Sequence, residues 1–190
     1  MIHMLVELPT WMLIRSFGIL SYLTLFIGMV MGISYSFPTI KGHRKGLLLR
    51  WHTYANITGM GFALLHTVLL IIDTFMPFDW AELLIPFHAA NSPLWNGLGT
   101  IAMYGLLLVL LTTDIRHKLK RKLWLALHML SYPIFALLLL HGFFLGTDSK
   151  QGWAILMYVV TAIILLGLTV LRMQQSIRKR QVKLGPTKHL

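Results

Sequence analysis

Four histidines in apolar stretches have the spacing expected of ligands to two iron centres. His52 and His66 lie fourteen positions apart in one hydrophobic segment, and His128 and His141 lie thirteen positions apart in another. Neutral imidazole is a common ligand of haem iron, and ionisable groups inside a membrane are functional candidates. Both segments are expected to run in the same direction, so His52 is level with His128 and His66 with His141. At about 1.5 Å of rise per residue the two levels are roughly 20 Å apart, which suits two stacked, six-coordinate b-type haems.

Helical rotation supports one of these pairs better than the other. At about 100° per residue, fourteen positions return His66 to within roughly 40° of His52, which is one helix face. Thirteen positions leave His141 about 140° away from His128 in an ideal helix. Pro133 lies between them and can distort the helix, but the sequence does not show that the distortion corrects this angle.

A single histidine in a membrane helix is often a packing or hydrogen-bonding residue, and that alternative applies to each of the four. Their arrangement in two depth-matched pairs is what favours ligands. Gly59 lies midway between the two histidines of the first segment, and its missing side chain is expected to let a flat ring approach the backbone.

Three further positions have two interpretations each. Phe135 lies between the two histidine levels, where it either assists electron transfer or is an ordinary core aromatic residue. Tyr132, one turn after His128, either packs on the inner porphyrin or belongs to the same aromatic core. Arg50 and Trp51 either hold a haem propionate and cover the inner haem edge, or anchor the helix at the membrane interface.

The elements that must position these residues are membrane-spanning helices. Of the 190 residues 56% are hydrophobic and 12% are charged, with a mean hydropathy of +0.70, whereas a soluble domain carries about 25% charge. Each of five apolar segments reaches the roughly 17 residues that a spanning helix needs. They are Trp11–Phe37, Leu47–Thr74, Leu94–Thr113, Leu123–Gly146 and Trp153–Leu171. The predicted fold is an all-α polytopic membrane bundle, and the proline-containing segment Phe75–Pro93 is expected to be partly helical and to lie on the surface.

Charge distribution orients this bundle. Of the 17 basic residues, 15 lie in three regions, at 41–50, at 116–122 and in the tail after the fifth segment. The positive-inside rule places all three in the cytoplasm, which predicts an N-terminus outside and a C-terminus inside. The positive charge thus has an explanation without nucleic acid. The absence of cysteine excludes iron–sulfur clusters and covalently attached haem.

The predicted organisation is a haem-binding transmembrane domain at 1–172, in contact with membrane lipid, followed by a basic cytoplasmic tail at 173–190. We expect such a chain to be a multi-pass protein of the cell membrane, in a bacterial plasma membrane. About 18 residues follow the fifth segment, fewer than the roughly 50 of a small domain, so no flavin or nicotinamide domain is expected within the chain.

Several short stretches of the chain resemble the ferric reductase-like transmembrane domain family, and together they extend over about 11–172. This family includes ferric reductases, NADPH oxidases and the haem subunit of a bacterial methionine sulfoxide reductase system. The similar stretches are Arg50-Trp51-His52, Leu65-His66, Leu123 to His128, Leu140-His141-Gly142, Arg15-Ser16-Phe17-Gly18 and Leu98 to Ala102.

The resemblance implies a protein that moves electrons across the membrane through two haem b groups. His52 and His128 would ligate the inner haem, and His66 and His141 the outer haem. Arg15 matches the family's first-helix arginine, which binds a propionate or polarises the acceptor near the outer haem; alternatively, its side chain extends to the interface.

The expected function is therefore that of an oxidoreductase subunit of ferric reductase type. It would take electrons from a separate cytoplasmic flavoprotein and pass them to ferric iron or oxygen outside. Two alternatives stay open at this point. One is a cytochrome b linked to membrane quinol, and the other is a membrane protein without redox function.

Overall fold

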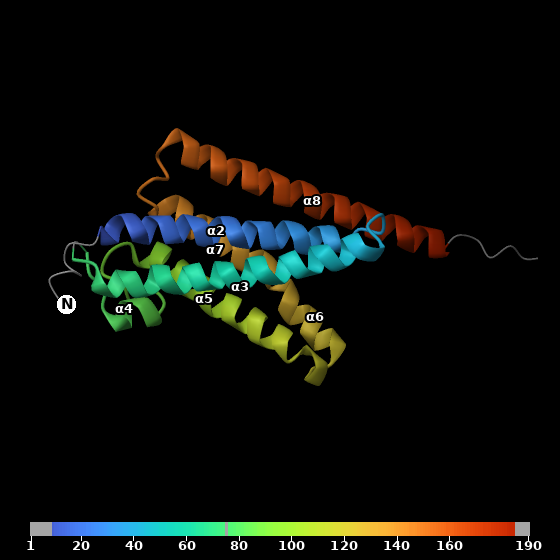
Figure 1. Cartoon of the computed structure of the whole chain (residues 1–190), viewed down its shortest axis with the longest axis horizontal. Helices are drawn as coiled ribbons and strands as arrows, with labels where there is room; N and C mark the ends of the chain where they lie inside the picture. Colours follow the sequence, from blue (N-terminus) through green and yellow to red (C-terminus); the bar gives the residue numbers. More distant parts are fainter. Residues whose placement is uncertain (1–8, 75, 185–190) are drawn as a thin grey trace, which may run out of the picture.

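The computed structural model describes residues 9–74 and 76–184, with side chains as far as Arg178, and every regular element in this part of the chain is helical (Figure 1). Five stretches are long and apolar enough to cross a membrane. They are α2 (Thr10–Tyr35), α3 (Gly42–Ile72), α5 (Pro93–Asp114), the consecutive helices α6 (Arg121–Met129) and α7 (Ser131–Leu145), and α8 (Gly152–Leu184). The predicted all-α bundle with five spans is therefore confirmed.

Two helices extend beyond the predicted segments into basic sequence. α3 begins at Gly42, whose φ of 57° suits a residue without a side chain. It therefore includes most of the basic region at 41–50. α8 continues to Leu184, so the predicted basic tail starts as a helix. Both differences have one cause, because lysine and arginine are good helix formers and neither stretch contains an interior proline.

The fourth span is broken at Leu130 because Pro133 has no backbone N–H. In an unbroken helix that N–H would donate to the carbonyl of Met129. At the break, the N–H of Leu130 donates to the carbonyl of Leu127 at 3.1 Å, and the N–H of Ile134 donates to Leu130 at 3.0 Å. The first of these bonds closes a tighter, 3₁₀-type turn, and such a turn changes the rotation between α6 and α7.

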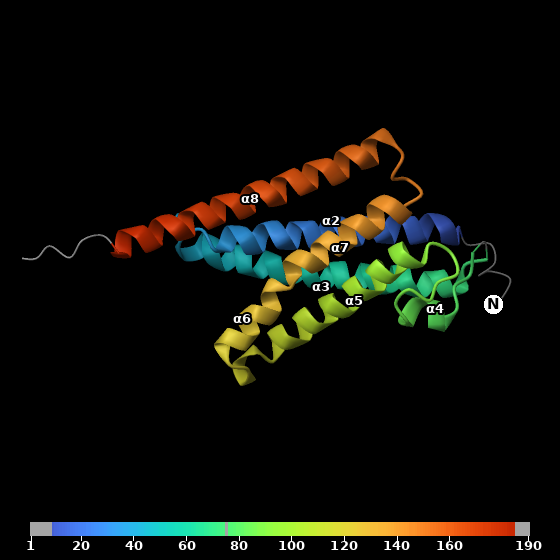
Figure 2. The same ribbon diagram turned by 180° about the vertical axis from the view of Figure 1, so that it is seen from behind.

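Helices α2 and α3 lie side by side and antiparallel (Figures 1 and 2). Small residues allow their backbones to approach closely. The hydroxyl of Ser21 donates to the carbonyl of Gly59 at 2.8 Å, and a Cβ at Gly59 would lie 2.6 Å from Cγ of Leu25. The expectation that Gly59 admits a flat ring is therefore wrong, because the side chain of Leu25 already fills that space.

The centre of the bundle is aromatic. Phe135 is 6% exposed and stacks on Tyr22 of α2, with ring centroids 5.2 Å apart. Tyr22 also packs against Tyr158 of α8 at 5.0 Å and shares a 2.6 Å hydrogen bond with the hydroxyl of Thr161. These contacts attach α8, which lies along one side of the bundle (Figure 1), to the central helices.

The segment at 75–93 contains the short helix α4 (Trp80–Leu84), and its helical character is as predicted. One carboxylate holds this segment together. Glu82 accepts hydrogen bonds from the N–H of Ala90 at 2.8 Å and from the N–H of Asp79 at 3.0 Å. Both bonds favour the ionised form and lower the pKa of the Glu82 carboxyl, so this group stays charged at neutral pH.

The three basic regions lie at one end of the bundle. In Figure 1 the α2–α3 turn, the α5–α6 connection and the C-terminal part of α8 are at the same end, and α4 and the α7–α8 connection are at the other. In a bundle of five spans, the connection after the first span, the connection after the third span and the C-terminus all lie at the same end. The side of the membrane that the basic end faces stays a prediction of the positive-inside rule.

Cysteine labelling tests this sidedness in a chain that has no native cysteine. Ser92 precedes α5 at one end of the bundle, and Ser176 lies in the exposed final part of α8 at the other. A membrane-impermeant maleimide added to intact cells should label Ser92→Cys and not Ser176→Cys, whereas both should react after permeabilisation. The opposite pattern in intact cells would reverse the topology.

Candidate functional site

The structure brings the four histidines together as two pairs. His52 on α3 lies beside His128 on α6, with ring centroids 6.1 Å apart and ring planes at 66°. His66 on α3 lies beside His141 on α7, with centroids 6.5 Å apart and planes at 86°. These are the partners expected from depth in the membrane. The break at Leu130 places His128 on α6 and His141 on α7. The rotation expected for thirteen residues of one straight helix therefore does not apply.

Both separations match those of two imidazoles bound to opposite sides of one metal ion. A metal–imidazole bond is about 2 Å long and the ring centroid lies about 1.1 Å beyond the nitrogen, so the two centroids would be about 6.3 Å apart. Rotation of a ring about the metal–nitrogen bond leaves this distance unchanged, so either angle between the planes is compatible. Both centroid separations are therefore compatible with one metal ion between the two rings.

Three of the four histidines are fixed by a hydrogen bond from Nδ1 to a backbone carbonyl. His52 donates to Gly28 at 2.7 Å, His66 to Ile14 at 2.9 Å, and His141 to Trp95 at 2.8 Å. A carbonyl oxygen only accepts, so Nδ1 carries the proton and Nε2 has the free lone pair. This is the tautomer of a metal-binding histidine whose second nitrogen is held by the protein.

The same three histidines lie against glycines, where a side chain would collide with the ring. A Cβ added at Gly18 would lie 3.2 Å from Nδ1 of His66. The corresponding distance is 2.9 Å for Gly32 and His52, and 2.6 Å for Gly99 and His141. The sequence contained a signal for two of these glycines, because Gly18 and Gly32 have the same separation along the chain as His52 and His66.

His128 is held differently. Its Nδ1 atom is buried and has no hydrogen-bond partner among the described residues. The ring stacks on Trp124 of the same helix, with centroids 5.4 Å apart and planes at 29°. The orientation of His128 therefore depends on a ring contact, whereas its three counterparts have a directional hydrogen bond.

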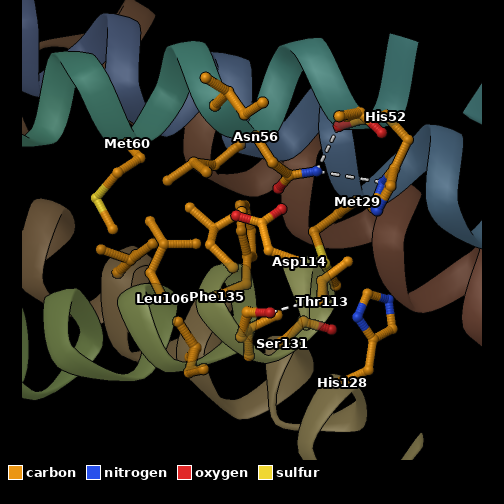
Figure 3. Close-up of a pocket in the computed structure, with 17 residues that line it drawn as sticks. Met29, His52, Asn56, Met60, Leu106, Thr113, Asp114, His128, Ser131 and Phe135 are labelled. Atoms are coloured by element: carbon orange, nitrogen blue, oxygen red, sulfur yellow. Dashed lines mark hydrogen bonds between the residues drawn. The ribbon is translucent and has the colours of Figure 1, made fainter. Parts of the chain in front are cut away.

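A cavity of about 360 Å³ extends from the His52–His128 pair toward the bundle centre (Figure 3). Most of its wall is apolar, as in ligand pockets generally, and Phe135 forms part of that wall. Polar groups are concentrated near the histidines. They are Thr53 and Asn56 from α3, Thr113 and Asp114 from α5, and Ser131 from α7.

The structure does not bring Arg50 to either histidine pair. Arg50 and its neighbour Trp51 are both exposed on α3, and the ring of Trp51 packs edge-on against Tyr54 at 6.4 Å. Tyr132 accepts a 2.8 Å hydrogen bond from Arg172 of α8. These contacts fit the interfacial and packing interpretations of the three residues.

Arg15 lies in the helical turn that contacts His66, one residue after the carbonyl that accepts from His66 Nδ1. Its guanidinium forms a two-pronged ion pair with Asp148 in the α7–α8 connection, through Nε at 2.7 Å and through a second, shorter contact. The side chain of Arg15 is 40% exposed and that of Asp148 is 16% exposed. Nothing in the sequence indicated this partner, which lies 133 positions further along the chain.

Among the described residues there is no group of three or more histidine, cysteine or acidic side chains that could hold a metal ion. A bare ion such as Zn²⁺ usually takes at least three protein ligands. Haem iron takes only its axial ligands from the protein because the porphyrin supplies the other four. Two facing histidines therefore fit haem better than a bare metal ion.

Comparison of the chain with protein-family models, with curated proteins and with solved structures gave no match. The resemblance to the ferric reductase-like domain consequently stays a prediction from the residues that carry it.

Proposed function

We propose that this chain is a transmembrane electron-transfer protein with two haem b groups, one held by His52 and His128 and the other by His66 and His141. The observation that carries the proposal is the pair of ring separations, 6.1 and 6.5 Å. Each separation is within a few tenths of an ångström of the distance set by one metal ion between two imidazoles. Two such pairs that share one helix, at two separate levels, are hard to attribute to packing.

Haem iron supplies one-electron transfer by alternating between its ferric and ferrous states. The residues of the chain would orient the ligands and line the haem site. Three backbone carbonyls hold the proton of their histidines on Nδ1, which leaves Nε2 free and turns the rings toward their partners. Apolar side chains form most of the cavity wall at the His52–His128 pair, and the buried ring of Phe135 is part of that wall.

The proposed direction of transfer is from a cytoplasmic donor at the basic end to an acceptor such as ferric iron or oxygen at the opposite end. In support, the charged side chains at 116, 118 and 120–122 are exposed, which suits the steering of an acidic flavoprotein. At the opposite end Arg15, which is ion-paired with Asp148, follows the residue whose carbonyl holds His66. Efficient NADPH oxidation by the purified chain alone would contradict the need for a separate donor.

Membrane quinol is the alternative donor. The two donors are distinguished by mixing the oxidised haem-loaded chain with menaquinol in one experiment and with a reduced flavoprotein in another. Haem reduction by menaquinol alone would replace the flavoprotein in the proposal.

Haem content is the direct test of the proposal. The purified, haem-supplemented chain should bind about two haems with six-coordinate, low-spin spectra before and after reduction by dithionite. Replacing His66 or His141 by alanine should remove the haem of that pair, and replacing His52 or His128 should remove the other.

His117→Ala is the matched control, because His117 is exposed in the α5–α6 connection and its loss should leave both haems in place. A wild-type chain with no Soret band would exclude the proposal. Loss of haem from the His117→Ala chain would show that these assays do not report on the pairs.

A further inference from the structure

Helix α2 makes the same pair of contacts to a histidine ring at two levels. At each level a carbonyl accepts from a histidine Nδ1, and a glycine four residues later lies against the same imidazole ring. The two sets are the Ile14 carbonyl with Gly18 for His66, and the Gly28 carbonyl with Gly32 for His52. The separation of the two sets along α2 equals that of the two histidines along α3.

Helix α5 makes this pair of contacts, a carbonyl and a glycine against one histidine, at one level and lacks it at the other. The carbonyl of Trp95 and Gly99 hold His141. At the same separation further along α5, the corresponding positions are Val109 and Thr113, and both line the cavity beside His128. Here the hydroxyl of Thr113 donates to the Val109 carbonyl at 2.7 Å, and the Nδ1 atom of His128 is buried without a partner among the described residues.

Thr113 takes the position that a glycine takes in the other three sets. In an α-helix the side chain of a residue lies beside the carbonyl four residues before it, which is why threonine hydroxyls donate to that carbonyl. A glycine leaves the carbonyl open to a ring from another helix. The Val109 carbonyl instead accepts from hydroxyls of its own helix, from Thr113 at 2.7 Å and from Thr112 at 3.2 Å.

We infer that Thr113 makes His128 the exchangeable ligand of the four, so that a small neutral molecule such as carbon monoxide replaces it at ferrous iron. The inference rests on the proposed function. A hydrogen bond from Nδ1–H fixes the ring and makes the imidazole a stronger donor, and His128 lacks it. In the exchange one iron–nitrogen bond breaks and one iron–carbon bond forms, and no electron is transferred.

Full-length chains with one intact pair allow the test. His66→Ala with His141→Ala leaves the inner pair, and His52→Ala with His128→Ala leaves the outer pair. Each chain is loaded with haem, reduced with dithionite and titrated with carbon monoxide while the absorption spectrum is recorded. The inner-pair chain should bind carbon monoxide at least about tenfold more tightly than the outer-pair chain, because loss of an outer-shell partner weakens a metal ligand by about 10- to 100-fold.

Thr113→Gly in the inner-pair chain should restore the acceptor, weaken carbon monoxide binding by about 10- to 100-fold and lower the midpoint potential of the haem. Thr169→Gly is the matched control. It introduces the same glycine in α8, at a threonine whose hydroxyl donates to the Leu165 carbonyl at 2.7 Å and which does not line the cavity, and it should change neither quantity.

Equal carbon monoxide affinities in the two single-pair chains would overturn the inference, as would equal effects of Thr113→Gly and Thr169→Gly. If Thr113→Gly does not fold, the comparison of the two single-pair chains decides alone. The absence of a Soret band from both single-pair chains and from the wild type would instead contradict the proposed function.

Discussion

Replacing Gly99 by alanine is expected to remove the haem held by His66 and His141 and to leave the other haem in place. The added Cβ would lie 2.6 Å from both Nδ1 and Cε1 of His141, well inside van der Waals contact. The ring must then move away from α5 and lose its hydrogen bond to the Trp95 carbonyl. Loss of such a partner alone lowers metal affinity about 10- to 100-fold, and displacement of the ring adds to that loss.

The three glycines provide a graded series for this experiment. The shortest distance from an added Cβ to the ring is 2.6 Å at Gly99, 2.9 Å at Gly32 and 3.2 Å at Gly18. Haem loss in the alanine variants should follow that order, with Gly18→Ala mild because a shift of a few tenths of an ångström relieves the contact. Haem per chain, measured by titration and absorption spectroscopy, reports the series.

Gly61→Ala is the control, because a Cβ there has no neighbour within 4 Å. Alanine in place of a helical glycine generally stabilises a helix by about 0.5–1 kcal/mol, so haem loss at Gly99 cannot be attributed to poor helix formation. Full haem occupancy in both Gly99→Ala and Gly32→Ala would show that these glycines do not position ligands.

The spans and the histidine partners could be predicted because they depend on segment length and depth alone. A run of about 20 apolar residues needs a helix to cross a membrane, and residues at equal depth on parallel helices lie level. No knowledge of helix contacts is needed for either step. For the same reason His52 could be matched with His128, and His66 with His141, before the helices were placed.

What could not be predicted depends on how neighbouring helices touch. Pro133 indicated a distortion, but a missing N–H does not specify how the two halves of the helix rotate. Gly59 indicated a close approach, but the sequence could not show that Leu25 would be the neighbour. Arg15 and Asp148 lie far apart in the sequence, and only the packing of α8 and its connection places them together.

The second large effect is expected at Arg15, where alanine should slow reoxidation of the reduced haems by an external acceptor while both haems remain bound. Arg15 lies beside the turn that holds His66, and neither of its hydrogen bonds is to a histidine. If two histidines occupy the iron, an acceptor must receive its electron at the haem edge, where a fixed positive charge favours an anion. A hydrogen bond to a charged group contributes about 1.5–3 kcal/mol, which is about a 10- to 100-fold change in rate.

The Arg15→Ala variant needs a control for the charge of Asp148. Arg15→Ala removes a positive charge and also leaves the mostly buried Asp148 carboxylate unpaired, and that carboxylate alone would repel an anionic acceptor. The double variant Arg15→Ala with Asp148→Asn removes the repulsion. If Arg15 binds the acceptor, reoxidation stays slow in the double variant, and Asp148→Asn alone makes it faster for anionic ferric chelates because the guanidinium is released. Stopped-flow spectroscopy of the haem bands with ferric citrate measures all four proteins, and wild-type rates in the double variant would leave Arg15 with a structural role only.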